Sequence, residues 1–181
     1  MYKVVLWGLG HGYDVFTYLH GHEMVDVVAV TDRECYFRKQ IDGIPVVRVD
    51  ELASMEFEYL IVTVVNNQVY QEIVRQAMKL GIARSKILPL RIFEIPFFNF
   101  DEYVKIKNSN VSILADGCLG GLLYHRFGLE MTSPTINMSI DNADYYRFLE
   151  NLESYLTKDM VEVTDVVDNA YKGLFCFPRG R

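Results

Sequence analysis

The chain has 181 residues, and its 24 Asp and Glu outnumber its 18 Lys and Arg, which gives a formal net charge of −6. This length accommodates one large domain or two small ones, and a composition with 50% hydrophobic and 23% charged residues excludes wholesale disorder. The acidic balance argues against nucleic-acid binding, which needs clustered Lys and Arg, and no apolar run approaches the roughly 20 residues of a membrane span.

Short apolar runs alternate with helical patterns through the first half of the chain. Runs rich in β-branched residues are typical of strands that are buried on both faces of a parallel sheet. The expected strands are residues 2–7, 25–30, 44–49, 59–65 and 87–90. The predicted fold class is therefore α/β, with a Rossmann-like parallel sheet over residues 1–90, the strand order 3-2-1-4-5 and helices on both faces.

The helix expected after the fourth strand has signals at both of its ends. Asn66 and Asn67 are N-cap candidates, because their side chains can accept hydrogen bonds from the first backbone N–H groups of a helix. Apolar residues then recur at helical spacing up to Leu80, and Gly81 is a candidate C-terminal cap.

A second, smaller α/β unit is expected after an aromatic stretch. Residues 91–110 are predicted to form an aromatic hinge between a first domain, 1–90, and a partial second domain, 111–181. Asp141 or Asn142 is expected to cap an amphipathic helix in that second domain. Further strands are expected at 111–115, 134–140 and 174–177. The last of these would be left uncovered, which predicts a homodimer unless the chain is a piece of a longer protein.

The glycine turn behind the first strand is the first candidate site. Glycines between a strand and a helix let backbone N–H groups approach a phosphate, and an acidic residue at the end of the second strand can bind ribose hydroxyls. Asp32 lies 20 residues after Gly12, the separation that a dinucleotide-binding fingerprint requires. The candidate ligand-binding residues are Gly8, Gly10, His11, Gly12, Tyr13 and Asp32.

The spacing of this turn departs from the fingerprint G-x-G-x-x-G. The third glycine would stand at position 13, where the chain has Tyr13, and a bulky side chain there is expected to disturb the close packing of helix on strand. A tight turn without a ligand is therefore the alternative. Asp32 could equally cap the loop that follows it, and His11 could be solvated.

Several pieces around this turn together resemble a known domain. They are W-G-L-G-H-G at 7–12, V-A-V-T-D ending at Asp32 and I-P-V at 44–46. They are similar to an N-terminal domain of bacterial acetyltransferases of nucleotide-linked amino sugars, which also precedes some polysaccharide-associated methyltransferases. In those acetyltransferases the domain binds the nucleotide-sugar substrate and not NAD, and their loop usually has one more residue before G-H-G. The resemblance covers about residues 1–90.

A second glycine turn, D-G-C-L-G-G, supplies the candidates Asp116, Cys118, Gly120 and Gly121. A Cys at a helix N-terminus can have a lowered pKa and act as a nucleophile. The sequence shows no base for it, because His125 lies about two helical turns further on. A buried structural Cys is therefore the interpretation that we favour.

The second half contains pieces that recur in a known family. They are Cys118 with Gly120 and Gly121, then F-G-L at 127–129, T-S-P-T at 132–135 and F-L-E-N-L at 148–152. They resemble a bacterial family of unknown function associated with exopolysaccharide and capsule synthesis. Asp116, Gly117 and Leu119 stand where that family has Asn, Asn and Trp. Its members continue well beyond this length, so that the resemblance implies a shortened member or a fragment.

The expected function is the binding of a nucleotide or nucleotide-sugar in the biosynthesis of exopolysaccharide or another surface glycan. One alternative is an NAD(P)-dependent oxidoreductase, for which Tyr103 and Lys107 supply a Tyr-x-x-x-Lys pair, and another is a non-catalytic nucleotide-binding regulatory module. The ligand is thus a nucleotide-sugar or NAD(P), and catalysis is left open. Three Cys without CxxC spacing predict reduced thiols, no metal site and a cytoplasmic location.

Overall fold

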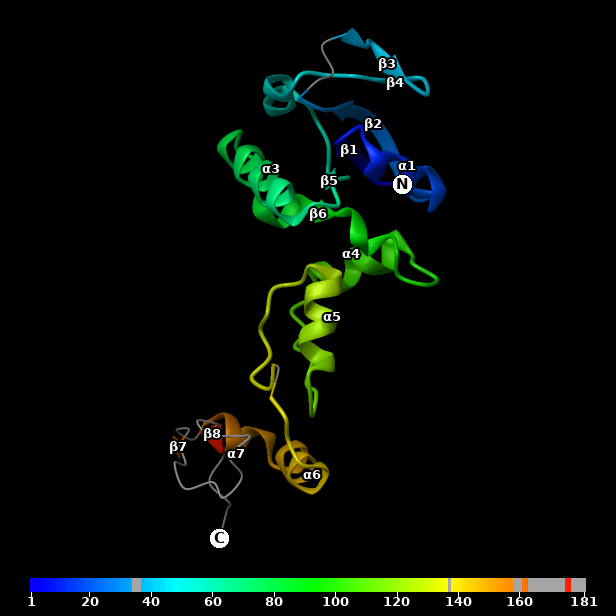
Figure 1. Cartoon of the computed structure of the whole chain (residues 1–181). Coiled ribbons are helices and arrows are strands. Elements are labelled where there is room, and N and C mark those ends of the chain that lie inside the picture. Colours follow the sequence, from blue (N-terminus) through cyan, green and yellow to red (C-terminus); the bar gives the residue numbers. More distant parts are fainter. Residues whose placement is uncertain (34–36, 137, 158–160, 163–174, 177–181) are drawn as a thin grey trace. The chain divides into compact units, whose positions relative to one another are not determined.

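The computed structural model describes residues 1–33, 37–136, 138–157, 161–162 and 175–176 (Figure 1). The chain divides into two compact units. The first unit consists of Met1–Val111 and Leu123–Glu130, and the second consists of Ser112–Leu122 and Met131–Arg181.

A parallel sheet forms the centre of the first unit. Its strands are β1 (Lys3–Trp7), β2 (Asp26–Thr31), β5 (Tyr59–Val62) and β6 (Ile87–Pro89), in the order β2-β1-β5-β6. Next to β2, Val46 forms an isolated parallel bridge to Val30, and the Val47 N–H donates to the Val30 carbonyl at 2.9 Å. Four of the five predicted strands are thereby confirmed in their order, 2-1-4-5, and the predicted third strand is represented by this one bridge.

The prediction of a full strand over residues 44–49 is wrong. Ile44–Pro45 (β4) instead pairs antiparallel with Gln40–Ile41 (β3). The turn between them is Asp42-Gly43, whose φ angles are 49° and 80°. Two positive φ angles in a two-residue turn define a tight hairpin, and Pro45 has no N–H with which to extend a ladder.

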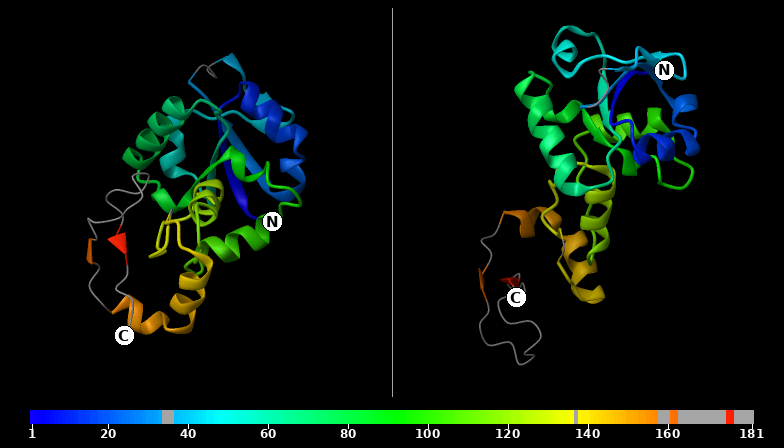
Figure 2. Two further views of the ribbon diagram at one scale, coloured as in Figure 1. Left: turned by 60° about the horizontal axis from the view of Figure 1, so that its bottom comes forward. Right: turned by 45° about the horizontal axis from the view of Figure 1, so that its top comes forward.

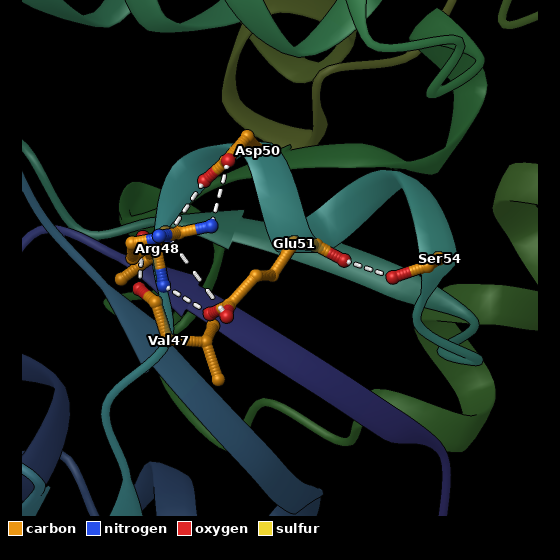
Figure 3. A network of polar contacts seen from close by, with 6 residues as sticks. Val47, Arg48, Asp50, Glu51 and Ser54 are labelled. Atoms are coloured by element: carbon orange, nitrogen blue, oxygen red, sulfur yellow. Dashed lines mark hydrogen bonds and ion pairs between the residues drawn. The ribbon is translucent and has the colours of Figure 1, made fainter.

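The chain behind the bridge is held by a polar network on Arg48, shown in Figure 3. The guanidinium donates to both carboxylate oxygens of Asp50, from Nε at 3.1 Å and from Nη2 at 3.0 Å. The backbone N–H of Arg48 donates to Glu51 Oε2 at 2.7 Å, at the start of the 3-10 helix η2 (Val49–Ser54). These contacts turn the chain into η2 directly after Val47, so that no further strand residues follow.

Helices cover both faces of the sheet. In β1 the side chains alternate, because Val4 and Leu6 belong to one apolar cluster and Val5 and Trp7 to the other. The first cluster includes residues of α1 (His11–Tyr18), η4 (Leu90–Ile92) and α4 (Phe100–Asn108). The second includes residues of η2 and α3 (Asn67–Lys79). Figure 2 shows α1 and α3 on opposite sides of the sheet. The short elements α2 (Gly21–Met24) and η3 (Arg84–Lys86) precede β2 and β6.

Both predicted end signals of α3 are confirmed. Asn66 Oδ1 accepts hydrogen bonds from the N–H groups of Gln68 at 2.9 Å and Val69 at 3.2 Å. At the other end Gly81 has a φ of 88°, and the Ile82 N–H donates to the Ala77 carbonyl at 3.1 Å. This is the arrangement of a Schellman cap, in which a left-handed glycine ends the helix.

The aromatic stretch 91–110 contributes to the core of the first unit. Phe93, Phe100 and Tyr103 are buried in the first apolar cluster, and the Phe93 and Phe100 rings stack at 5.9 Å. The Tyr103 hydroxyl donates to the Phe127 carbonyl at 2.9 Å. These residues therefore stabilise the same core as α1.

In the described part of the second unit, two of the predicted strands do not form. Residues 111–115, and the described part of 134–140, form no strand; there the Ala115 N–H donates to the side-chain Oγ1 of Thr135 at 3.1 Å. Asp141 caps α6 by accepting from the Ala143 N–H at 2.9 Å, as predicted. At the predicted strand 174–177, Leu174 and Phe177 lie outside the described residues. The elements are α5 (Leu119–Phe127, divided between the units), α6 (Asn142–Glu150), α7 (Leu152–Leu156), β7 (Val161–Glu162) and β8 (Phe175–Cys176, antiparallel to β7).

Candidate functional site

The predicted glycine turn lies between β1 and α1, at the carboxyl edge of the sheet. The strand order reverses there, because β2 lies on one side of β1 and β5 on the other. In open α/β sheets the crevice at such a reversal is the usual place for a ligand. The turn therefore lies where a binding site is expected from the topology alone.

Gly8 begins the turn in a conformation that favours glycine. Its φ is 123°, and its N–H donates to the Thr31 carbonyl at 2.9 Å. A Cβ at this position would lie 2.9 Å from Thr63 Oγ1. Backbone strain and lack of space thus both exclude a larger residue at position 8.

Thr63 is a residue of this site that the sequence analysis missed. It is buried directly behind β5, and its hydroxyl lies 2.6 Å from the Gly8 carbonyl and 3.1 Å from the Trp7 carbonyl, to which it donates. It therefore fixes the backbone at the point where the turn leaves β1. The available signal was a hydroxyl residue within the strongest apolar run of the chain.

Gly12 makes the close contact between helix and strand. A Cβ on this residue would overlap the Thr63 carbonyl. The interpretation that Tyr13 would disturb this packing is wrong, because Tyr13 belongs to the first apolar cluster and its hydroxyl donates to Asp42 Oδ2 at 2.8 Å. Burial and that hydrogen bond raise the pKa of Tyr13 to about 12.

Gly10 and His11 leave the start of α1 accessible. Gly10 is the N-cap of α1, and no side chain caps the helix there. A Cβ added to Gly10 would have no heavy atom within 4 Å. His11 is exposed, and within the described part of the chain no acceptor is bonded to the N–H of Gly10 or His11. These N–H groups and the positive end of the helix dipole can therefore face an anion.

Asp32 binds the glycine turn itself. Its Oδ2 accepts a hydrogen bond from the Leu9 N–H at 2.7 Å, and the residue is half-buried at the end of β2. The carboxylate thus holds the turn through the backbone of Leu9. The neighbouring Arg33 forms an ion pair with Glu72 of α3 at 2.6 Å, which links the ends of β2 and α3.

The second glycine turn has a different character. Asp116 and Cys118 are exposed, whereas Gly120 and Gly121 are buried. The interpretation of Cys118 as a buried structural residue is therefore wrong. A Cβ on Gly120 would lie 3.1 Å from the Ala115 Cβ, which explains the small residue at that position. No hydrogen bond joins the Cys118 thiol to a base among the residues with described positions.

The two residues of the Tyr-x-x-x-Lys pair, Tyr103 and Lys107, are both affected by burial. The hydroxyl of Tyr103 is occupied by the Phe127 carbonyl, and burial raises the pKa of this phenol. Burial also lowers the pKa of Lys107, with a smaller effect from the charge of Arg84.

The described residues contain no group of three or more His, Cys, Asp or Glu side chains that could hold a metal ion. None of the helices in that part of the chain is long and apolar enough to cross a membrane.

The first half of the chain matches one family model, and part of the chain matches one bacterial protein. Residues 1–88 match a family model described as C2185-like, N-terminal. An uncharacterized protein of Haemophilus influenzae is 27% identical over 67 residues, which is 37% of this chain and 32% of that protein. The chain thus aligns with about a third of the length of this relative.

A solved structure and a second family model complete the comparison. The crystal structure of RSP, a Rex-family repressor, matches with a TM-score of 0.39 and 14% identity, over 88% of this chain and 63% of that chain, which is less than two thirds of its length. Residues 90–181, more than half of the chain, match the model described as Domain of unknown function (DUF1919). The protein therefore belongs to the DUF1919 family.

Proposed function

We propose that the glycine turn binds the phosphate groups of a nucleotide or nucleotide-sugar. The observation that carries this proposal is the open start of α1 at Gly10, on the carboxyl edge of a parallel sheet where the strand order reverses. Backbone N–H groups and the helix dipole favour an anion at such a position. Thr63 and Asp32 hold the backbone on either side in place, so that little conformational entropy is lost when a ligand binds.

In this proposal the ribose lies near Asp32. The carboxylate is at the end of β2, and its hydrogen bond to the Leu9 N–H places it beside the turn. Carboxylate oxygens are good acceptors for ribose hydroxyls. In such a complex the backbone N–H groups near Gly10 would bind the phosphates, and the Asp32 carboxylate would accept hydrogen bonds from the ribose.

The pathway that we propose is the biosynthesis of exopolysaccharide or another surface glycan. The support is the resemblance of the first half to the nucleotide-sugar-binding domain of amino-sugar acetyltransferases, and of the second half to a capsule-associated family. An oxidoreductase is less well supported, because the Tyr103 hydroxyl is engaged by a backbone carbonyl. We therefore place a nucleotide-sugar ahead of NAD(P) as the ligand.

A thermal-shift screen with UDP-glucose, NADH, NADPH and coenzyme A tests the proposal, because a ligand that binds only the folded state raises the melting temperature. The decisive variant is Gly10→Leu, since the space around Gly10 is open and its φ of −87° suits any residue. We expect it to fold normally and to lose affinity for the ligand by more than about tenfold. Asp32→Ala should weaken binding by about 1–3 kcal/mol.

Gly117→Leu is the matched control. Gly117 also has open space around it and no positive φ, but it lies outside the glycine turn of residues 8–12. It should bind the ligand like the unmodified protein. Unchanged titration curves for both Gly10→Leu and Asp32→Ala would place the ligand elsewhere. A shift with none of the four ligands would reject the nucleotide classes tested.

A further inference from the structure

Arg91 lies at the carboxyl edge of the sheet, in the 3-10 helix η4 that follows β6 directly. The glycine turn lies at the same edge, because the strands are parallel, but β5 stands between β1 and β6. Neighbouring strands are about 5 Å apart, so that β6 ends about 10 Å from β1. Arg91 is therefore separate from the proposed phosphate site at Gly10.

The guanidinium of Arg91 is partly withdrawn from water and has no partner. Arg91 is half-buried, and its Nε is fully buried without a hydrogen-bond partner. No ion pair joins it to a carboxylate of the described residues, and Glu94, the nearest acid along the chain, pairs with Arg126 at 3.5 Å. A partly desolvated positive charge without a partner costs free energy, which an anion at this position would recover.

Tyr70 is a second polar group without a partner. It is the fourth residue of α3 and only 5% exposed, and its hydroxyl is buried without a hydrogen bond. Tyr103 shows that Tyr70 and Arg91 are neighbours. Burial is the main reason that the pKa of the Tyr103 phenol is raised, and the smaller electrostatic effects include Tyr70, which raises this pKa, and Arg91, which lowers it. Both groups therefore lie near the Tyr103 phenol.

We propose that Arg91 and Tyr70 form a binding site for an oxyanion, the carboxylate or phosphate group of a small molecule. Both side chains can donate hydrogen bonds and Arg91 adds positive charge, so that the partner they lack is a negatively charged acceptor. The fork of a guanidinium matches the oxygens of these groups. The Tyr103 hydroxyl takes no part, because it donates to the Phe127 carbonyl.

The path to this site begins at Arg91. Its side chain is half-buried rather than enclosed, so that an oxyanion can approach it from solvent. The Tyr70 hydroxyl is enclosed, and binding therefore has to move the Arg91 side chain before the oxyanion reaches Tyr70. Signals from both residues should consequently change when the site is filled.

The probes are glucuronate and glucose, which share a sugar ring but differ in the carboxylate, and inorganic phosphate. We expect glucuronate, titrated into the full-length protein at low salt, to shift the backbone amide NMR signals of Tyr70 and Arg91, and glucose to leave them in place. Phosphate in place of glucuronate distinguishes the two sources of the oxyanion, and shifts with either anion support the site. Equal shifts with glucose and glucuronate, or no shift with either anion, would overturn the proposal.

Two variants and a control separate this site from general attraction of anions to a positive charge. Arg91→Gln should weaken anion binding by at least about tenfold, yet it should not lower the stability of the free protein, where the guanidinium has no partner to lose. Tyr70→Phe removes only the hydroxyl and should weaken binding by about tenfold, also without loss of stability. Arg75→Gln, which removes an exposed charge on α3, should leave the affinity unchanged.

An equal loss of affinity in Arg75→Gln would show that the anion binds without using the site. Unchanged affinity in Arg91→Gln, together with lower stability, would make Arg91 a purely structural residue. Gly10→Leu is the second reference, because it blocks the proposed nucleotide site, and its affinity for glucuronate or phosphate at Arg91 should be that of the unmodified protein. The oxyanion site can therefore fail or hold independently of the nucleotide site.

Discussion

At the scale of single residues, Gly8, Gly10 and Gly12 lie in one turn but have different neighbours. Gly8 has a positive φ and little space, Gly12 lies against the Thr63 carbonyl, and Gly10 faces open space. The first two positions therefore need glycine for the fold. At Gly10 neither backbone strain nor lack of space requires glycine, and this openness is the basis of the proposed phosphate site.

Gly12→Ala should destabilise the protein, because the added methyl group overlaps the Thr63 carbonyl and the helix must move away from β5. Overpacking of this kind costs about 1–3 kcal/mol. Gly10→Ala is the matched control and should cost less, at most about 1 kcal/mol, because Ala is less favourable than Gly at an N-cap but its methyl group meets no other atom. Urea unfolding followed by circular dichroism measures both. Equal stabilities of the two variants would contradict the contact.

Tyr13→Phe should change how stability depends on alkaline pH. In the folded state the pKa of Tyr13 is raised from its ordinary value of 10 to about 12, because the phenol is buried and donates to Asp42. A raised pKa means that this contribution to stability is complete below pH 10 and is lost as the pH rises toward 12. Unfolding free energies of both proteins between pH 8 and 12 should therefore converge. A constant difference between them would show that Tyr13 does not titrate in this way.

At the scale of elements, α3 shows how local signals define a helix. Its Asn66 cap and its Gly81 end are properties of adjacent residues, and the structure has both. The region 44–49 shows the opposite case. Its apolar pattern suits a strand, but the Asp42-Gly43 turn and Pro45 convert its start into a hairpin.

Asn66→Ala should destabilise α3, because Asn66 Oδ1 accepts from two N–H groups that would otherwise lose their partner. Removal of an N-cap costs about 1 kcal/mol. Asn67→Ala is the control: Asn67 is the first helical residue, is exposed and makes no cap bond. Chemical denaturation should place the midpoint of Asn66→Ala below that of Asn67→Ala. The reverse order would assign the cap to Asn67.

At the scale of the whole molecule, the first unit ends later than the predicted first domain. Ile92, Phe93, Phe100, Tyr103 and Val104 all lie beyond residue 90 and belong to the first apolar cluster. The compact unit extends to Val111 and takes up Leu123–Glu130 as well. The predicted domain boundaries and the homodimer stay predictions, since independent folding and association are separate properties.

A chain that ends at Glu130 should therefore unfold cooperatively, because it contains all residues of the first unit. A chain that ends at residue 90 should not, because it lacks the aromatic residues that cover the β1 side chains Val4 and Leu6. Thermal unfolding by circular dichroism compares the two. A sharp transition at the same temperature in the shorter chain would contradict this assignment of the core.

The sequence by itself determined the α/β class, the order of four of the five predicted parallel strands and the two ends of α3. These features depend on hydrophobic periodicity, which reports burial, and on end signals that involve neighbouring residues. The same local evidence predicted the glycine turn and Asp32 as neighbours, and the structure joins them through the Leu9 N–H.

Only the tertiary structure decided how that site is built. Gly12 rather than a residue at position 13 meets the sheet because of the path that α1 takes past Thr63, and Asp32 supports the turn through Leu9. The contact between the Thr63 hydroxyl and the Gly8 carbonyl was not visible in the sequence either. Each of these features depends on contacts between residues that are far apart in the sequence, and no local sequence pattern specifies such contacts.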